Sequence, residues 1–89
     1  MKNLLFKNNV EVIYLNKVIY SKKSIKKGIK VYDQFINFKT SENSNYLKIK
    51  IKSLDEKKYT SKILADEFVN YLIALEYEIS NVSNVNKNK

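Results

Sequence analysis

The chain contains few of the residue types that carry out chemistry in proteins. Among its 89 residues there is no cysteine and no histidine, which removes the usual nucleophile, the usual general base and the main transition-metal ligands. Nine carboxylates remain, but no two of them form a close pair in a glycine-containing loop. We therefore expect a protein that is not an enzyme and that has no catalytic residue, no metal site and no cofactor.

Lysines are the most numerous side chains that could bind a partner. All seventeen positive charges are lysines, against nine acidic residues, so the net charge is +8. A genome rich in A and T explains the choice of lysine over arginine, but it does not explain the excess of positive charge. Most lysines lie in residues 1–59, whereas residues 60–79 contain one lysine and four acids. A basic surface attracts nucleic acid, a membrane or an acidic peptide without selecting among them.

One long amphipathic helix, predicted over residues 60–80, organises the elements that position these lysines. Its apolar residues recur at helical spacing and predict one buried stripe. The stripe consists of Leu64, Phe68, Leu72, Leu75 and Ile79. Thr60 or Ser61 can cap its first turn. A chain of this size buries only about 60 to 65% of its unfolded surface, so burial against a partner or a second copy would help.

The residues before this helix predict two hairpins with a helix between them. Residues 10–15 and 18–20 are β-branched and aromatic and are separated by two residues, which indicates a tight hairpin. Residues 36–40 and 46–52 predict a second hairpin. In the strand over 46–52, apolar residues and lysines alternate, so one face should be buried and the other solvated and positive.

The helix predicted over residues 22–35, with Ser21 as its N-cap, has two distinct faces. Its lysine face consists of Lys22, Lys23, Lys26, Lys27 and Lys30, and its opposite face is apolar. Gly28, the single glycine of the chain, lies within the apolar face. Glycine destabilises a helix by about 1 kcal/mol relative to alanine. We therefore expect that Gly28 is present because the helix packs closely there against the sheet or the final helix, with no room for a side chain.

These elements predict an α+β fold in the order ββαββα. The expected architecture has two layers, with a four-stranded antiparallel sheet and two helices on one face. The single domain should span residues 1–79, beginning with a short lead-in over residues 1–8. Residues 80–89 lack an apolar period and are predicted to form a disordered tail. Because the sequence shows neither a signal peptide nor a membrane span, we expect a cytoplasmic location.

Three segments of the chain resemble a known family. They are Val18-Ile19-Tyr20-Ser21, the helix start Ser24-Ile25-Lys26-Lys27-Gly28 with Tyr32 and Phe35 near its end, and Ala65-Asp66-Glu67-Phe68-Val69-Asn70-Tyr71-Leu72. Together they resemble the small HxsD-like proteins, which accompany radical S-adenosylmethionine (SAM) enzymes in gene clusters that mature ribosomally made peptides. The resemblance covers roughly residues 10–79. It implies a noncatalytic accessory role, in which the protein holds a precursor peptide or supports the radical SAM enzyme.

The candidate partner-binding residues lie on the first helix and on the second hairpin. They are Lys22, Lys26, Lys27, Lys30, Lys39, Tyr46, Lys48, Lys50 and Lys52. An open sheet edge among these lysines could accept an acidic peptide as an added strand. The alternative is a small basic nucleic-acid-binding protein, for which the exposed sheet face offers Tyr46, Asn37 and lysines. No membrane partner is expected, and a homodimer is a third arrangement.

Overall fold

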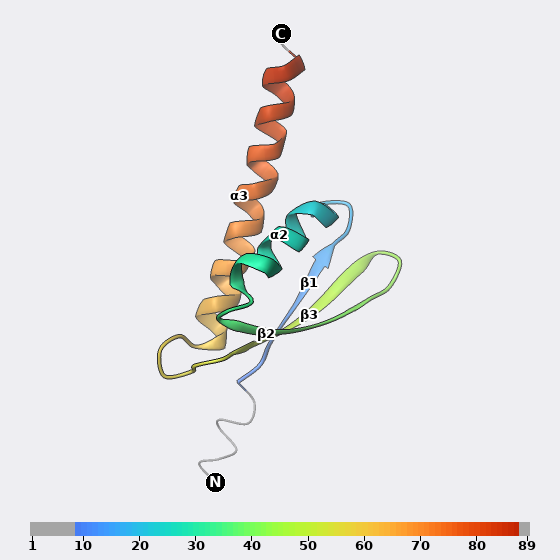
Figure 1. The fold of residues 1–89 in the computed structure, drawn as a ribbon. Coiled ribbons are helices and arrows are strands. Elements are labelled where there is room, and N and C mark those ends of the chain that lie inside the picture. The colour runs from blue at the N-terminus through green and yellow to red at the C-terminus, as the bar shows by residue number, and fades with distance from the viewer. Residues whose placement is uncertain (1–8, 88–89) are drawn as a thin grey trace.

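The computed structural model describes residues 9–87, which form three strands and two helices (Figure 1). In chain order these are β1 (Glu11–Asn16), α2 (Lys22–Tyr32), β2 (Ile36–Glu42), β3 (Tyr46–Ser53) and α3 (Ser61–Lys87). The sheet order is β1-β3-β2, and the central β3 is antiparallel to both neighbours. The unit β1-α2-β2 is therefore a split β-α-β unit, with β3 inserted between its two parallel strands.

The prediction of a four-stranded sheet is wrong, because residues 18–20 form a turn. The backbone oxygen of Asn16 accepts hydrogen bonds from the N–H groups of Ile19 and Tyr20, at 3.1 and 3.0 Å. Its side-chain oxygen accepts another from the N–H of Val18, at 2.8 Å. These local bonds to an asparagine compete with strand pairing, and they leave Val18 93% exposed.

The first predicted hairpin therefore does not form, and the element order is βαββα. Instead, β1 pairs along β3, with Glu11 opposite Ile51 and Asn16 opposite Tyr46. The predicted second hairpin is confirmed as β2 and β3, paired from Ile36 with Ser53 to Glu42 with Leu47.

The hydrophobic core lies between one face of the sheet and both helices, which confirms that the two helices share a face. The sheet contributes Leu15, Ile36, Ile49 and Ile51, α2 contributes Ile25, and α3 contributes Leu64, Ala65, Phe68 and Leu72. Phe68, which is 0% exposed, packs against Tyr32 of α2 and Phe38 of β2, with ring centroids 6.0 and 5.1 Å apart. One α3 side chain thus joins α2 to the sheet.

The predicted helix boundaries are only partly right. α2 ends at Tyr32 rather than at residue 35. α3 begins at Ser61, where Thr60 caps it by accepting a hydrogen bond from the N–H of Ile63 at 3.2 Å. It continues to Lys87 and extends well beyond the sheet (Figure 1), because no glycine or proline stops it.

The end of the helix therefore does not coincide with the domain boundary predicted at residue 79. Residues 80–87, which were expected to belong to a disordered tail, continue α3. The predicted lead-in over residues 1–8, the last two residues of the tail and the side chain of Ile79 lie outside the described part of the chain.

The start of α2 is fixed to α3 by a hydrogen-bonded carboxylate. As predicted, Ser21 caps α2, because its hydroxyl accepts a hydrogen bond from the N–H of Ser24 at 3.1 Å. The carboxylate of Glu76 accepts hydrogen bonds from the N–H and the hydroxyl of Ser21, at 2.7 and 2.8 Å. Burial alone would raise the pKa of Glu76, but hydrogen bonding by Ser24 and Ser21 outweighs it and holds the pKa below its usual value.

Gly28 lies where α2 packs closely on α3, which confirms the predicted helix contact. A Cβ atom at this position would lie 2.7 Å from Cδ2 of Leu72 and 3.0 Å from Cε1 of Phe68. Both of these side chains are fully buried, so they have little room to move aside.

We expect Gly28→Ala to lower the free energy of unfolding by about 1 kcal/mol. Overpacking a core costs roughly 1 to 3 kcal/mol, whereas the better helix propensity of alanine returns about 1 kcal/mol. Urea denaturation followed by circular dichroism measures the difference, with Lys27→Ala on the exposed face of α2 as the control. If Gly28→Ala were more stable than the wild-type protein, the Leu72 side chain would be able to move aside, and the contact would not be tight.

We expect Glu76→Gln to lower the free energy of unfolding by about 1 to 2 kcal/mol at pH 7, because the hydrogen bonds lose their charge. A carboxyl whose pKa is lowered by folding stabilises above its unfolded value of 4.5 and loses that contribution as pH falls through the folded value. The difference between wild type and variant should therefore shrink below pH 4.5. Glu78→Gln, an exposed change on the same helix, should stay within about 0.5 kcal/mol. A difference that does not change with pH would contradict this role of the Glu76 charge.

Candidate functional site

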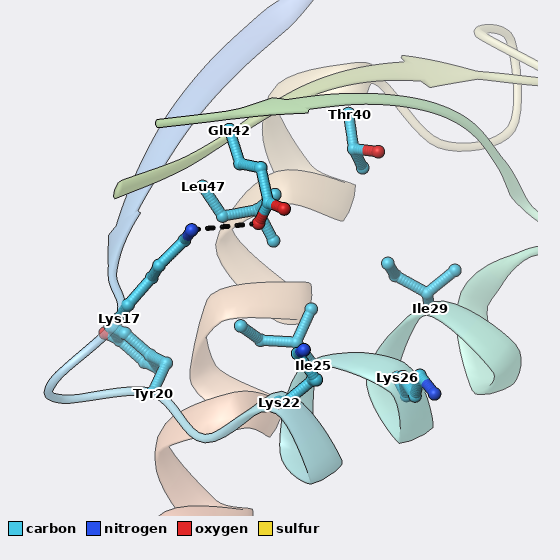
Figure 2. Close-up of a pocket in the computed structure, with 9 residues that line it drawn as sticks. All are labelled: Lys17, Tyr20, Lys22, Ile25, Lys26, Ile29, Thr40, Glu42 and Leu47. Carbon is cyan, nitrogen blue, oxygen red and sulfur yellow. Dashed lines mark ion pairs between the residues drawn. The ribbon is translucent and has the colours of Figure 1, made fainter. Parts of the chain in front are cut away.

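A groove of about 460 Å³ lies between α2 and the strands β2 and β3 (Figure 2). Its apolar lining comes from Ile25 and Ile29 of α2, from Leu47 of β3 and from Tyr20, which precedes α2. Its polar lining consists of Lys17, Lys22, Lys26, Thr40 and Glu42. The groove therefore combines apolar walls with three lysines. This combination suits a ligand that is partly apolar and partly anionic.

The strand beside the groove has an unpaired edge, because β2 lies at one end of the sheet. The N–H of Asn43 donates to the oxygen of Tyr46, and the N–H of Leu54 donates to the oxygen of Phe35. In an antiparallel ladder these bonds alternate along the strand, so the odd-numbered residues of β2 bond to β3. The backbone N–H and C=O groups of Phe38 and Thr40 consequently point to the open edge.

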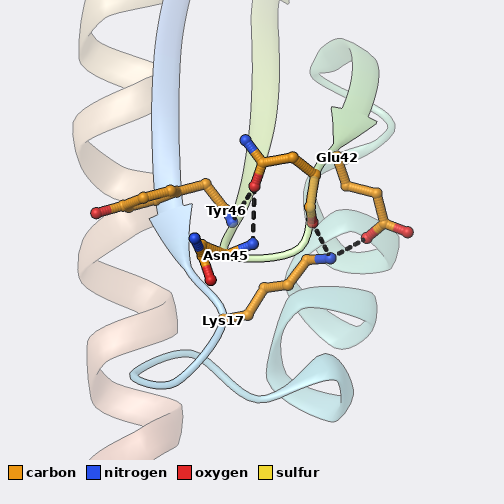
Figure 3. Close-up of polar contacts among 5 residues, drawn as sticks. Lys17, Glu42, Asn45 and Tyr46 are labelled. Carbon is orange, nitrogen blue, oxygen red and sulfur yellow. Dashed lines mark hydrogen bonds and ion pairs between the residues drawn. The ribbon is translucent and has the colours of Figure 1, made fainter.

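One of the three groove lysines is already neutralised. Lys17 forms an ion pair with Glu42 at 3.0 Å and also donates a hydrogen bond to the backbone oxygen of Asn43 (Figure 3). The hydrogen bond from Lys17 and the charge of Lys17 hold the pKa of the Glu42 carboxyl below its usual range. By contrast, Lys22 and Lys26 take part in no ion pair among the described residues. The free positive charge of the groove therefore lies on its α2 side.

The predicted partner-binding residues do not form one surface. Lys22 and Lys26 line the groove, whereas Lys27 and Lys30 are exposed on α2 outside it. The other five belong to β2 and β3 and alternate with residues that face the core, so they lie on the uncovered side of the sheet. These five are Lys39, Tyr46, Lys48, Lys50 and Lys52.

Several groove residues were missed at the sequence level. Lys17 was assigned to a hairpin turn that does not exist, and Glu42 and Thr40 carried no signal of their own. Ile25 and Ile29 belong to the apolar face that was predicted for this helix, so that face was a usable signal. Since Ile29 is only half-buried, part of that face is left for a ligand.

A larger hollow near the start of α3, of about 560 Å³, is a weaker candidate. It carries Glu11 and Glu56 together with Lys52, Lys57 and Lys62, so charges of both signs offset each other there. The Glu56 carboxylate is also already hydrogen-bonded to the hydroxyl of Ser61. These features leave little for a ligand to bind.

Neither a metal site nor a membrane span is found within residues 9–87. No three acidic side chains in this range gather closely enough to hold a metal ion. None of the helices described is both long and apolar enough to cross a bilayer.

Comparisons with protein-family models, with curated proteins and with solved structures give no match. The resemblance to HxsD-like proteins therefore stays a prediction based on the sequence segments given above.

Proposed function

We propose that this protein is a noncatalytic accessory protein that binds an acidic segment of a peptide as an added strand on β2. The observation that carries this proposal is the open edge of β2 beside a groove with apolar walls and two unpaired lysines. Following the family resemblance, we propose that the peptide is a ribosomally made precursor. The protein would then hold it in the cytoplasm for a radical SAM enzyme.

The backbone of β2 supplies the affinity in this arrangement. An added strand pairs with the outward N–H and C=O groups of Phe38 and Thr40, and strand addition of this kind is a common mode of peptide recognition. Successive side chains of the added strand point to opposite faces of the sheet. Every second peptide side chain therefore points to the side of the sheet where α2 and the groove lie.

The groove supplies the selection. A peptide side chain directed into it meets the apolar surface of Ile25 and Ile29, so an aliphatic residue is favoured there. The next side chain on the same face can approach Lys22 or Lys26, which favours aspartate or glutamate. We therefore expect the bound segment to carry an aliphatic and an acidic residue two positions apart.

We expect a synthetic peptide of repeating Val-Thr-Glu-Thr, in which valine and glutamate stand two positions apart on one face of the strand, to shift the backbone amide signals of Phe38 and Thr40 in a nuclear magnetic resonance titration. Ile25 and Ile29 should shift with them. Reversing two charges in Lys22→Glu/Lys26→Glu should weaken binding about tenfold or more, since each exposed ion pair contributes up to about 1 kcal/mol. The matched control is Lys48→Glu/Lys50→Glu, which changes the net charge equally on the other side of the sheet.

A second variant tests the strand edge without changing charge. Thr40→Pro removes an N–H that β3 does not use, and proline is tolerated at sheet edges, so the protein should fold but bind the peptide poorly. Thr40→Val keeps the N–H and should bind normally. Equal loss of binding in the two double-lysine variants, or amide shifts confined to β1, would contradict the proposal.

A further inference from the structure

The side of the sheet that the helices leave uncovered has an unusual composition. We call it the lysine–tyrosine face, and it is defined by Tyr14, Lys39, Tyr46, Lys48, Lys50 and Lys52. Tyr14 and Tyr46 belong to this side because residues that pair directly across strands share a face: Tyr14 pairs with Lys48, and Tyr46 pairs with Asn16. The uncovered side thus carries four lysines and two tyrosines.

By the alternation of side chains along the strands, neither acidic strand residue belongs to this face, although each borders it at one end. Of the two acidic strand residues, Glu11 pairs with the buried Ile51 and Glu42 lines the groove, so both belong to the covered side. Lys39 and Lys50 lie directly opposite each other on neighbouring strands, an arrangement of like charges that is destabilising. An anionic ligand would relieve this repulsion.

The two tyrosines add a second kind of contact. Tyr14 is 63% exposed and Tyr46 is 43% exposed. Both line a hollow of about 180 Å³, together with Ser41, Asn43, Lys48 and Glu42, whose carboxylate is paired with Lys17. Figure 3 shows Tyr46 on the opposite side of the turn between β2 and β3 from the Lys17–Glu42 pair. Exposed aromatic rings beside lysines suit planar groups that carry negative charge close by.

We propose that the lysine–tyrosine face binds single-stranded nucleic acid without sequence selection. Bases stack on Tyr14 and Tyr46, and phosphates are neutralised by the lysines. A single strand is favoured over a duplex because bases must be unstacked to reach the rings. It is favoured over an acidic protein because carboxylates would use the lysines but not the two tyrosines.

This proposal is independent of the peptide proposal, because the two surfaces lie on opposite sides of the sheet. The lysines of β3 recur at every second residue, about 7 Å apart along the strand, and Lys39 extends the charge across to β2. A strand of nucleic acid can therefore follow β3 with phosphates on the lysines while its bases reach the hollow at one end.

The test measures fluorescence anisotropy of a labelled oligouridine in increasing salt. We expect the logarithm of the affinity to fall linearly with the logarithm of the salt concentration, with a slope of about 0.7 for each phosphate neutralised. Tyr14→Ala should weaken binding about tenfold, whereas Tyr14→Phe, which keeps the ring, should bind like wild type. Circular dichroism verifies that each variant is folded.

The charge variants locate the site. Lys48→Glu/Lys50→Glu should abolish binding, whereas Lys22→Glu/Lys26→Glu, with the same change in net charge, should retain most of it. Equal effects of the two variants, or full affinity in Tyr14→Ala, would overturn the proposal in favour of general attraction to polyanions. Binding of heparin as tightly as oligouridine would overturn it as well, because heparin has no bases. Amide shifts on this face with an acidic peptide but not with oligouridine would assign the face to a protein partner instead.

Discussion

The packing of α3 against α2 and the sheet is the interaction on which the rest of the structure depends. Phe68 and Leu72 are both fully buried, and both lie within contact of the position where Gly28 brings α2 close to α3. With no cysteine in the chain to cross-link it, the stability of this small domain depends mainly on such packing. Because α2 packs closely on α3, its outer side is left apart from β2, and the groove lies in that space.

The sequence predicts the local features of this fold well. Both helices, the Ser21 cap and the buried side of β3 follow from short-range periodicity and from the preferences of single residues. The close contact at Gly28 could also be predicted, because glycine is unfavourable inside a helix and its presence on an apolar face indicates that a neighbouring element packs closely there. Residues 18–20 were misread because their β propensity was weighed without the bonds that Asn16 makes to the following backbone.

The candidate sites were less predictable, because each depends on pairing between segments far apart in the sequence. Tyr14 lies beside Lys48 only because β1 pairs with β3, and a predicted hairpin with residues 18–20 concealed that neighbour. The lysines themselves were identified correctly, but their division between two sides of the sheet follows from the strand order. The lysines therefore lie in two different surroundings. Two lysines of α2 line an apolar groove beside an open strand edge, whereas those of β2 and β3 lie on a sheet face with exposed tyrosines.

The two open edges of the sheet offer similar backbone groups but have different surroundings. The N–H of Lys17 donates to the oxygen of Asn45, so Val12 and Tyr14 direct their backbone groups to the outer edge of β1, just as Phe38 and Thr40 do on β2. On the covered side of the sheet, β1 is contacted by α3. The edge of β2 instead adjoins the groove and the lysines of α2. The lysines beside the edge of β2 therefore attract an acidic strand to it, in addition to the backbone groups that both edges offer.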